Sequence, residues 1–276
     1  MTDEISSDKE TKISSWFNAF KMNRPLKLVP IFALLIIWYV VTNLGLVRPL
    51  FLPSPQSVIQ SYVDLWPSLP AATGISLSMI LLGFTIGSTI GVALSILMAY
   101  SKGFLLVFET IFDLLRPVPV FALIPMFVLW FGIGMAPQVG LIALGCSVIM
   151  GVTTTEAVRN IPNIYIQASY TLGANRRVVF RTIVLPTIFP HLIGAIRLAA
   201  ASSFGLDVAA EFMGSQTGLG YLMIVQQQYL NTSGIFAIVI LYSVIAFVVD
   251  KLIAMIESRF TAWTDRSSKN NVLINH

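Results

Sequence analysis

Charged residues are scarce in this 276-residue chain: Asp, Glu, Lys and Arg make up 11%, whereas hydrophobic residues make up 56%. A water-soluble domain carries about 25% charged residues. Too few polar side chains therefore exist to coat a globule in water, and much of the surface must face lipid. The length suits one bundle of about six membrane spans of roughly 20 residues each.

Cysteine and histidine are also rare. The single cysteine, Cys146, lies in an apolar run, which excludes an internal disulfide and a cysteine-based metal cluster. The two histidines, His191 and His276, are isolated in the sequence, so no metal site is expected. The chain also lacks the G-x-x-x-x-G-K-[ST] run that cradles ATP phosphates. We therefore expect no catalytic residue and no cofactor on this chain.

The formal net charge of +4 does not indicate nucleic acid as a partner. The Lys and Arg residues are spread along segment ends, and no basic stretch is interleaved with exposed aromatic residues. A cleavable signal peptide is not expected either, because the first 26 residues are polar and the first apolar run is too long. That run is expected to remain as a span.

Long apolar runs predict an all-α membrane protein with six transmembrane helices. The third run is interrupted by Arg116-Pro117-Val118-Pro119 and by Pro125, and proline in a helix interior removes a backbone hydrogen bond. Such a break is tolerated at membrane depth only where protein or a watery cavity satisfies the freed groups. A short helix is expected at Ser57–Leu65 and an irregular segment at Glu211–Leu230. The six expected spans are Leu28–Val47, Ala72–Tyr100, the run from Ser101–Gly103 to about Ile133, Pro137–Thr155, Pro190–Asp207 and Gly234–Ile256.

The basic residues indicate which span ends face the cytoplasm, because inner loops carry an excess of Lys and Arg. With six spans and an inner N-terminus, nearly all of the 17 basic residues lie inside. Only Arg48 lies outside, and Arg116 and Arg197 lie within spans. Both termini and the loop Glu156–Arg181 are therefore expected in the cytoplasm.

The expected domains are a cytoplasmic tail over residues 1–26, a transmembrane domain over 27–262 with a loop at 156–186, and a cytoplasmic tail over 263–276. In the first tail, apolar residues at helical spacing indicate an amphipathic helix on the inner leaflet. A frayed extension of the first span is the alternative. The apolar residues are Ile13, Trp16, Phe17 and Phe20.

Three glycines of the second span, Gly83, Gly87 and Gly91, recur every four residues. They place three hydrogen side chains on one helix face, which lets a neighbouring backbone approach closely. We interpret this face as a packing surface rather than as a substrate contact.

The loop Glu156–Arg181 predicts a short helix over residues 163–172. Pro162 suits the first turn of a helix, and Gly173 is a natural stop. A short helix held between two spans is either a solvated connector or a rigid knob that a cytoplasmic partner grips and moves.

This loop resembles the EAA loop of ABC importer permeases, written E-A-A-x3-G-x9-I-x-L-P. Gln167, Ala168 and Ser169 occupy the first three positions, Gly173 follows after three residues, and Ile183, Leu185 and Pro186 complete the motif. Gln replaces the usual acid and Ser replaces the second alanine. The resemblance implies that the loop couples to an ATPase through Tyr165, Ile166, Gln167, Ala168, Ser169, Leu172, Gly173, Ala174, Arg177, Ile183 and Pro186.

Other stretches resemble the permeases for nitrate, sulfonate, taurine and similar small solutes, and the resemblance covers about residues 28–262. It implies a MetI-like bundle in the bacterial inner membrane. The implied partners are a second copy of the chain, two ATPase subunits that bind ATP and Mg, and a periplasmic binding protein that delivers a small anionic or zwitterionic solute. The stretches are Phe51-Leu-Pro-Ser-Pro, Arg116-Pro-Val-Pro, Trp130-Phe-Gly-Ile-Gly, Val208-Ala-Ala-Glu-Phe and Gly218-Leu-Gly-Tyr.

Charged residues inside spans are costly and are read first as functional. Asp113 and Arg116 are three residues apart, so they could pair on one helix face, with solute contact as the alternative. For Arg197 we expect its side chain to extend to the membrane interface. Asp207 and Glu211 could form an outer gate or a dock for the binding protein, or could simply be solvated at the membrane edge.

Small residues over Ala199–Gly205 suit either close dimer packing or a solute path. The candidate path or gate residues are Arg116, Pro117, Pro119, Phe121, Ser202, Ser203, Asp207 and Glu211. Two other functions compete with the permease: a secondary transporter or channel driven by an ion gradient, which needs midplane carboxylates or inverted repeats, and a membrane scaffold that transports nothing.

Overall fold

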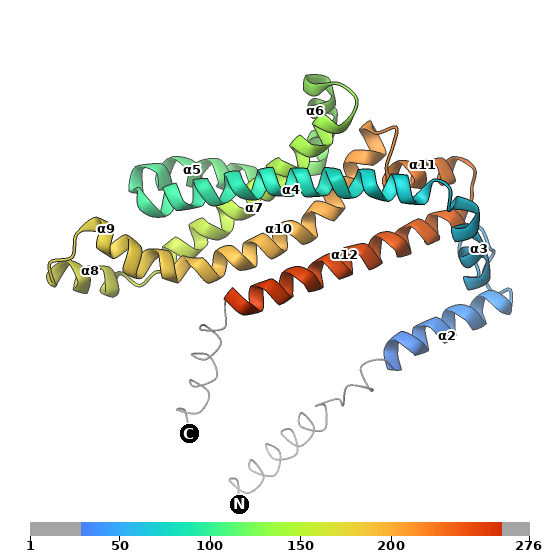
Figure 1. The fold of residues 1–276 in the computed structure, drawn as a ribbon, viewed down its shortest axis with the longest axis horizontal. Coiled ribbons are helices and arrows are strands. Elements are labelled where there is room, and N and C mark those ends of the chain that lie inside the picture. The colour runs from blue at the N-terminus through green and yellow to red at the C-terminus, as the bar shows by residue number, and fades with distance from the viewer. Residues whose placement is uncertain (1–28, 261–276) are drawn as a thin grey trace, which may run out of the picture.

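The computed structural model describes residues 29–260, and every regular element in that range is helical (Figure 1). The expected amphipathic helix over residues 13–20 and the tail over 263–276 lie outside the described residues. The elements are α2 (Val29–Asn43), α3 (Pro55–Leu65), α4 (Leu69–Tyr100), α5 (Lys102–Leu115), η2 (Val120–Leu123), α6 (Ile124–Phe131), α7 (Met135–Arg159), α8 (Asn163–Thr171), α9 (Arg176–Val179), η3 (Phe180–Val184), α10 (Leu185–Gly214), α11 (Leu219–Gln228) and α12 (Thr232–Phe260).

Four helical segments within the described range are long and apolar enough to cross a membrane. Three of them confirm expected spans to within a few residues. The fifth expected span was too short: η3 joins α9 to α10, so one helical segment runs from Arg176 to Gly214. Pro186 lies in the first turn of α10, directly after the π-helical turn η3, and Pro190 lies inside α10, so neither proline ends the segment. The four segments are Leu69–Tyr100, Met135–Arg159, Arg176–Gly214 and Thr232–Glu257.

The proline-rich stretch of the expected third span breaks the helix. α5 ends at Leu115, and the helix that resumes at Val120 is bent from α5 by 86°. Pro117 and Pro119 fall in the break, where they can donate no backbone hydrogen bond. In Figure 1, α5 lies beside α4, whereas α6 projects away from the bundle. The bent pair formed by α5 and the helix over Val120–Phe131 counts as a fifth candidate span if the two helices cross the membrane as one unit.

The first expected span is represented by α2, a helix of 15 residues with no buried side chain. At 1.5 Å per residue it is about 22 Å long, shorter than a hydrocarbon core of about 30 Å. Trp38 attaches it to the loop before α3, because its indole N–H donates to the Pro53 carbonyl at 2.9 Å. The structure therefore contains four or five candidate spans within residues 29–260.

The core lies where α4, α7 and α10 pack together. A side chain at Gly87 would overlap the backbone of Ala143 in α7, and one at Gly83 or Gly91 would also meet α7. The Ser147 hydroxyl donates to the Gly87 carbonyl at 3.1 Å across this contact. The interpretation of the glycine face as a packing surface is confirmed.

The bundle has two distinct ends, which Figure 1 shows at opposite extremes of its long axis. One end carries the short helices α8 and α9, and we refer to it as the α8 end. The other carries α3 and α11, and we refer to it as the α11 end. α12 runs between them and packs on α3, α10 and α11.

Candidate coupling loop and transport path

The segment between α7 and α10 folds as a short helix with defined ends. α8 begins directly after Pro162, which has φ −62° and ψ 125°. Gly173 adopts φ +82°, a left-handed conformation that favours glycine and ends helices. The N–H of Ala174 then donates to the Ser169 carbonyl at 3.0 Å. The expected helix over 163–172 is confirmed to within one residue.

α8 has an exposed apolar face and an anchored face. Ile164, Tyr165 and Leu172 leave 65%, 59% and 87% of their surface exposed. On the other side, Ile166 packs against a buried cluster from α7 and α10 that includes the fully buried Ile188. Apolar side chains gathered on an exposed surface are typical of a protein interaction site.

The residues that the EAA resemblance implicates fall into these two environments. The sequence did not single out Ile164, although it is as exposed as Tyr165. Nothing in the local sequence distinguishes Ile164 from the other apolar residues of this loop, such as Ile161 and Ile166. The exposed members are Tyr165, Gln167, Ala168, Leu172, Gly173, Arg177 and Pro186, and the half-buried members are Ile166, Ser169, Ala174 and Ile183.

The first group of candidate path residues lies at the break between α5 and α6. Arg116, Pro117, Pro119 and Phe121 are all exposed there, and Phe121 leaves 57% of its surface uncovered. Within one copy of the chain, this corner faces outward from the bundle.

The expected pairing of Arg116 with Asp113 is wrong. The Arg116 guanidinium reaches Glu156 of α7, with Nη2 to Oε1 at 2.8 Å. A second ion pair between the same two helices joins Arg159 to Glu109. The two ion pairs therefore tie α5 to α7. The arginine side chain is long enough for Arg116 to reach Glu156 on the neighbouring helix instead of Asp113 on α5.

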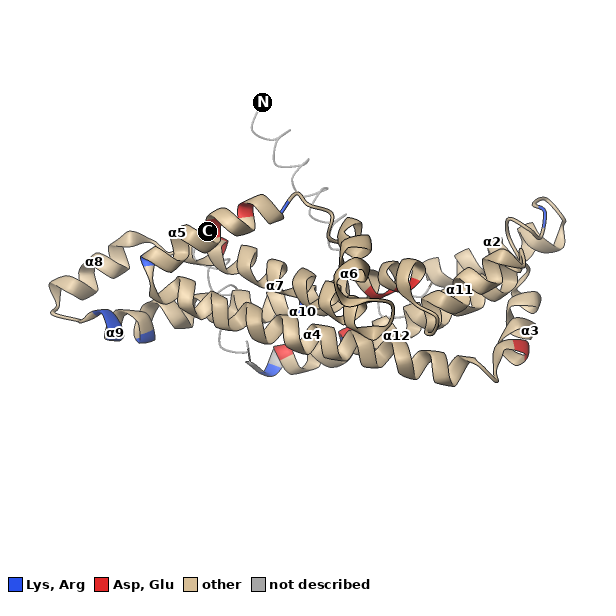
Figure 2. Ribbon diagram, turned by 90° about the horizontal axis from the view of Figure 1, so that it is seen from above, with Lys and Arg blue, Asp and Glu red and all other residues tan. Residues whose placement is uncertain are grey.

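The second group lies inside the bundle near the α11 end. Asp207 and Glu211 are both fully buried, so the interpretation that they are solvated at the membrane edge is wrong. Asp207 accepts a hydrogen bond from the Tyr242 hydroxyl of α12 at 2.5 Å. Figure 2 shows red, acidic segments of the ribbon between the labels of α6 and α11.

Glu211 holds the start of α11 against α4 and α10. Its carboxylate accepts hydrogen bonds from the Ser76 hydroxyl at 2.7 Å and from the Gly220 N–H. Ser76 in turn accepts from the Leu219 N–H at 2.9 Å. A carboxylate at the N-terminus of a helix also complements the helix dipole. We call Glu211, Ser76, Leu219 and Gly220 the α11 clamp.

Glycines make room for this carboxylate. Gly218 has φ +101°, and a side chain there would overlap the Glu211 carboxylate. The sequence does not indicate Ser76 and Tyr242 as site residues, because they lie 135 and 35 residues away from their carboxylate partners. No local spacing indicates contacts that only the packing of α4 and α12 on α10 creates.

The two serines of the small-residue run have different surroundings. Ser203 is fully buried and donates to the Ala200 carbonyl of its own helix at 2.7 Å. Ser202 is partly exposed, and Ala201 and Gly205 are exposed beside it. The exposed side of this run, rather than Ser203, is the part available to a partner or a solute.

Arg197 does not simply extend to the interface. Its Nε and Nη2 donate to the two carboxylate oxygens of Asp250 at 2.8 and 3.1 Å, and Nη1 donates to Glu257 at 3.3 Å. This fork joins α10 to α12, and bidentate geometry of this kind is specific to arginine.

The sequence of the chain is similar to those of known proteins. Residues 91–262 match the family model described as binding-protein-dependent transport system inner membrane component. The taurine transport system permease protein TauC of Escherichia coli K12 is 30% identical over 83% of this chain and 86% of its own length. The putative aliphatic sulfonates transport permease protein SsuC of Bacillus subtilis 168 is 29% identical over 82% of this chain and 83% of its own length.

Solved structures show the same fold. The chain matches the crystal structure of an amino acid ABC transporter with a TM-score of 0.57 at 20% identity, over 72% of this chain and 97% of that one. It matches an inward-facing MetNI methionine ABC transporter with a TM-score of 0.56 at 19% identity, over 72% and 96%. The family match covers more than half of the sequence and includes α8, and the chain belongs to the inner membrane components of binding-protein-dependent transport systems, the permease subunits of ABC importers.

Proposed function

We propose that the chain crosses the membrane six times with both termini in the cytoplasm, and that it pairs with a second copy of itself. The broken α5–α6 pair would be one crossing, and the segment containing α2 another. The distribution of Lys and Arg supports this orientation. The α8 end would then be cytoplasmic and the α11 end periplasmic.

The single observation that carries the mechanism is the two-faced helix α8. Its exposed Ile164, Tyr165 and Leu172 offer a grip to an ATPase subunit, and its anchored Ile166 contacts the cluster that includes Ile188 of α10. A force applied to α8 is therefore transmitted to the long helices. ATP binding would bring the ATPases together and rock the two bundles from inward- to outward-facing, and hydrolysis would reset them.

The solute we propose is a small sulfonate of the taurine type, or a nitrate-like anion, delivered by a periplasmic binding protein. The named substrates of TauC and SsuC support this class. The partly exposed Ser202 and the exposed Gly205 of α10, together with the exposed corner at Phe121, would line the path between two copies. Asp207 and Glu211 would shape the gate from within. ATP and Mg would bind only to the partner ATPase, and this chain needs no cofactor.

The test is uptake of labelled taurine into proteoliposomes that contain the permease and its ATPase, with binding protein outside and ATP inside. Leu172→Ala is expected to weaken ATPase binding and to reduce uptake about tenfold or more, because it removes the most exposed apolar contact of α8. Leu46→Ala is the matched control, since Leu46 is 68% exposed but lies between α2 and α3.

Two results would contradict the proposal. Uptake that proceeds without ATPase or ATP would indicate a gradient-driven transporter. Equal effects of Leu172→Ala and Leu46→Ala would remove α8 from the coupling mechanism.

A further inference from the structure

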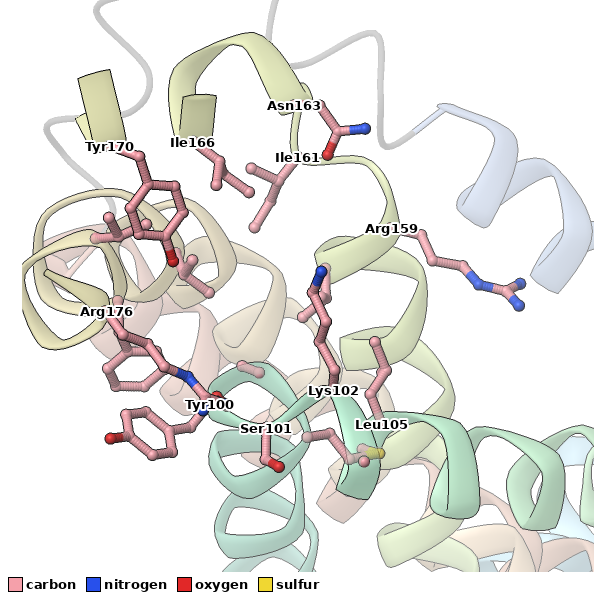
Figure 3. A pocket seen from close by; sticks show the side chains of 17 residues that line it. Tyr100, Ser101, Lys102, Leu105, Arg159, Ile161, Asn163, Ile166, Tyr170 and Arg176 are labelled. Carbon is pink, nitrogen blue, oxygen red and sulfur yellow. The ribbon is translucent and has the colours of Figure 1, made fainter. Parts of the chain in front are cut away.

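A cavity of about 580 Å³ lies behind α8, on the side that faces the bundle. It is partly open to the surface and is lined by the turn between α4 and α5, the end of α7, α8, and the start of the segment that leads into α10 (Figure 3). Its floor includes the buried side chains of Met98, Ile161 and Val179. This volume is within the range of small-molecule sites, which have apolar walls and a few polar groups.

The lining of this cavity carries charge of one sign. Among its 17 lining residues, the basic side chains are Lys102, Arg159 and Arg176, and none is Asp or Glu. Positive charge beside an apolar floor attracts an anion more strongly than it does in open water.

The three basic side chains differ in what they already contact. Arg159 pairs with Glu109. Arg176 is fixed in place, because its guanidinium lies 4.8 Å from the centre of the Tyr100 ring and donates to the Tyr100 carbonyl. Lys102 has no ion pair or hydrogen bond from its ammonium within residues 29–260. In Figure 3 its side chain extends across the cavity toward Ile161.

Two neutral polar side chains of α8, Asn163 and Tyr170, also line the cavity; in Figure 3 the Tyr170 hydroxyl points into it and Asn163 lies at its rim. Neither the Tyr170 hydroxyl nor the Asn163 amide has a hydrogen-bond partner in the described part of the chain. An ammonium, a fixed guanidinium, a hydroxyl and an amide together match the needs of a tetrahedral oxyanion, which accepts several hydrogen bonds at once.

We propose that this cavity binds an oxyanion of the phosphate or sulfonate class, either free in the cytoplasm or as the headgroup of an anionic phospholipid. Lys102 and Arg176 hold the charge, and Asn163 and Tyr170 donate from α8. The ligand therefore connects α8 to the α4–α5 turn and stiffens the helix that the ATPase grips. The assignment of this end to the cytoplasm rests on the proposed function, whereas the binding chemistry does not.

The experiment uses the permease with its ATPase in nanodiscs, and it compares Lys102→Gln with Lys251→Gln. Lys251 is an exposed lysine on α12 that lies outside the cavity, so its replacement removes the same charge elsewhere. In phosphatidylcholine discs, sodium phosphate is titrated against sodium chloride at equal ionic strength while the melting temperature is recorded. In discs that contain phosphatidylglycerol, native mass spectrometry records lipid that stays bound.

If the ligand is a free anion, phosphate raises the melting temperature, and Lys102→Gln increases the half-maximal phosphate concentration about tenfold, the loss expected for one charge-assisted hydrogen bond. If it is a headgroup, phosphatidylglycerol stays bound to the wild type and is lost from Lys102→Gln. Lys251→Gln and the charge-preserving Lys102→Arg behave as wild type in both cases.

The proposal is overturned if Lys102→Gln and Lys251→Gln respond alike to both probes. If the Lys102→Gln complex does not assemble, Tyr170→Phe is tested in its place. This substitution removes only one hydrogen-bond donor from the cavity, and it must also weaken anion binding. Taurine uptake is measured on the same samples. Loss of uptake with normal anion binding contradicts the proposed function alone, and normal uptake without anion binding contradicts only this inference.

Discussion

The two ends of the bundle differ in where their polar and apolar side chains lie. At the α11 end, polar groups are turned inward: Glu211 is fully buried and accepts hydrogen bonds from Ser76 and from the start of α11. At the α8 end, apolar groups are turned outward, and Leu172 leaves 87% of its surface exposed. The Glu211 carboxylate finds its hydrogen-bond partners within the chain, whereas the α8 end leaves apolar side chains exposed for a partner.

Because of this difference, we expect substitutions at the α11 end to change the stability of the chain and substitutions at the α8 end to change its coupling to a partner. Substitution of an internally satisfied group leaves its partners unsatisfied inside the protein, which costs free energy in the isolated chain. Substitution of an exposed group in the α8 end costs little until the partner is present. The comparison predicts a large loss of stability for the α11 clamp and a loss of coupling without loss of stability for α8.

The largest loss of stability is expected for Glu211→Ala. It leaves the Ser76 hydroxyl and the Gly220 N–H without their acceptor inside the bundle. At about 1–3 kcal/mol for each unsatisfied buried group, the free energy of unfolding should fall by about 3 kcal/mol. SDS titration of the purified permease in mixed micelles measures this change.

Glu211→Gln is the control for this prediction, because the amide keeps one acceptor oxygen and nearly the same shape. It should lose less than half as much stability as Glu211→Ala. If Glu211→Ala is as stable as the wild type but transports nothing, the α11 end is not internally satisfied and the comparison between the two ends fails.

A smaller loss is expected for Gly87→Ala, in the core that joins the two ends. The added methyl group would overlap backbone atoms of Ala143, which cannot move aside as a flexible side chain can. Overpacking of this kind costs about 1–3 kcal/mol. Gly194→Ala is the matched control, since nothing lies within 4 Å of a methyl group there. The same SDS titration should show no loss for Gly194→Ala, and equal losses at the two positions would refute the packing role of the glycine face.

Much of the fold could be predicted from the sequence, because apolar run length and proline position act locally. Helix α4 ends at Tyr100 as expected, and the helix breaks at the Pro117 and Pro119 stretch. The start of the helical segment Arg176–Gly214 could not be predicted, because Arg176 and Arg181 mark α9 and η3 as polar although they continue into α10 as one segment. Charged side chains near a membrane surface are compatible with helix, so polarity alone does not locate a helix end.

The candidate site residues also divide into those that the sequence predicts and those that it does not. The α8 loop is encoded over about 25 consecutive residues by a proline, a glycine and a motif of fixed spacing, so Pro162 and Gly173 sufficed to predict its ends. The contacts of Glu211 and Asp207 depend on α4 and α12, which lie far away in the sequence. The pairing of Arg116 with Glu156 has the same cause. Contacts between helices that are distant in sequence have no local signature.

The smallest loss of stability, with a large loss of coupling, is expected for Gly173→Pro at the α8 end. Proline fixes φ near −65°, whereas Gly173 has φ +82°, so the turn that ends α8 cannot form as it does in the wild type. The long helices do not depend on this turn, and the SDS titration should give a free energy of unfolding within about 0.5 kcal/mol of the wild type. Taurine-stimulated ATP hydrolysis in proteoliposomes should nevertheless be lost.

Gly173→Asn is the control for this prediction and should retain more of the ATP hydrolysis, because asparagine tolerates the left-handed conformation. If Gly173→Pro unfolds the bundle as Glu211→Ala does, α8 is part of the stabilising core, and the distinction between an open and a closed end no longer holds.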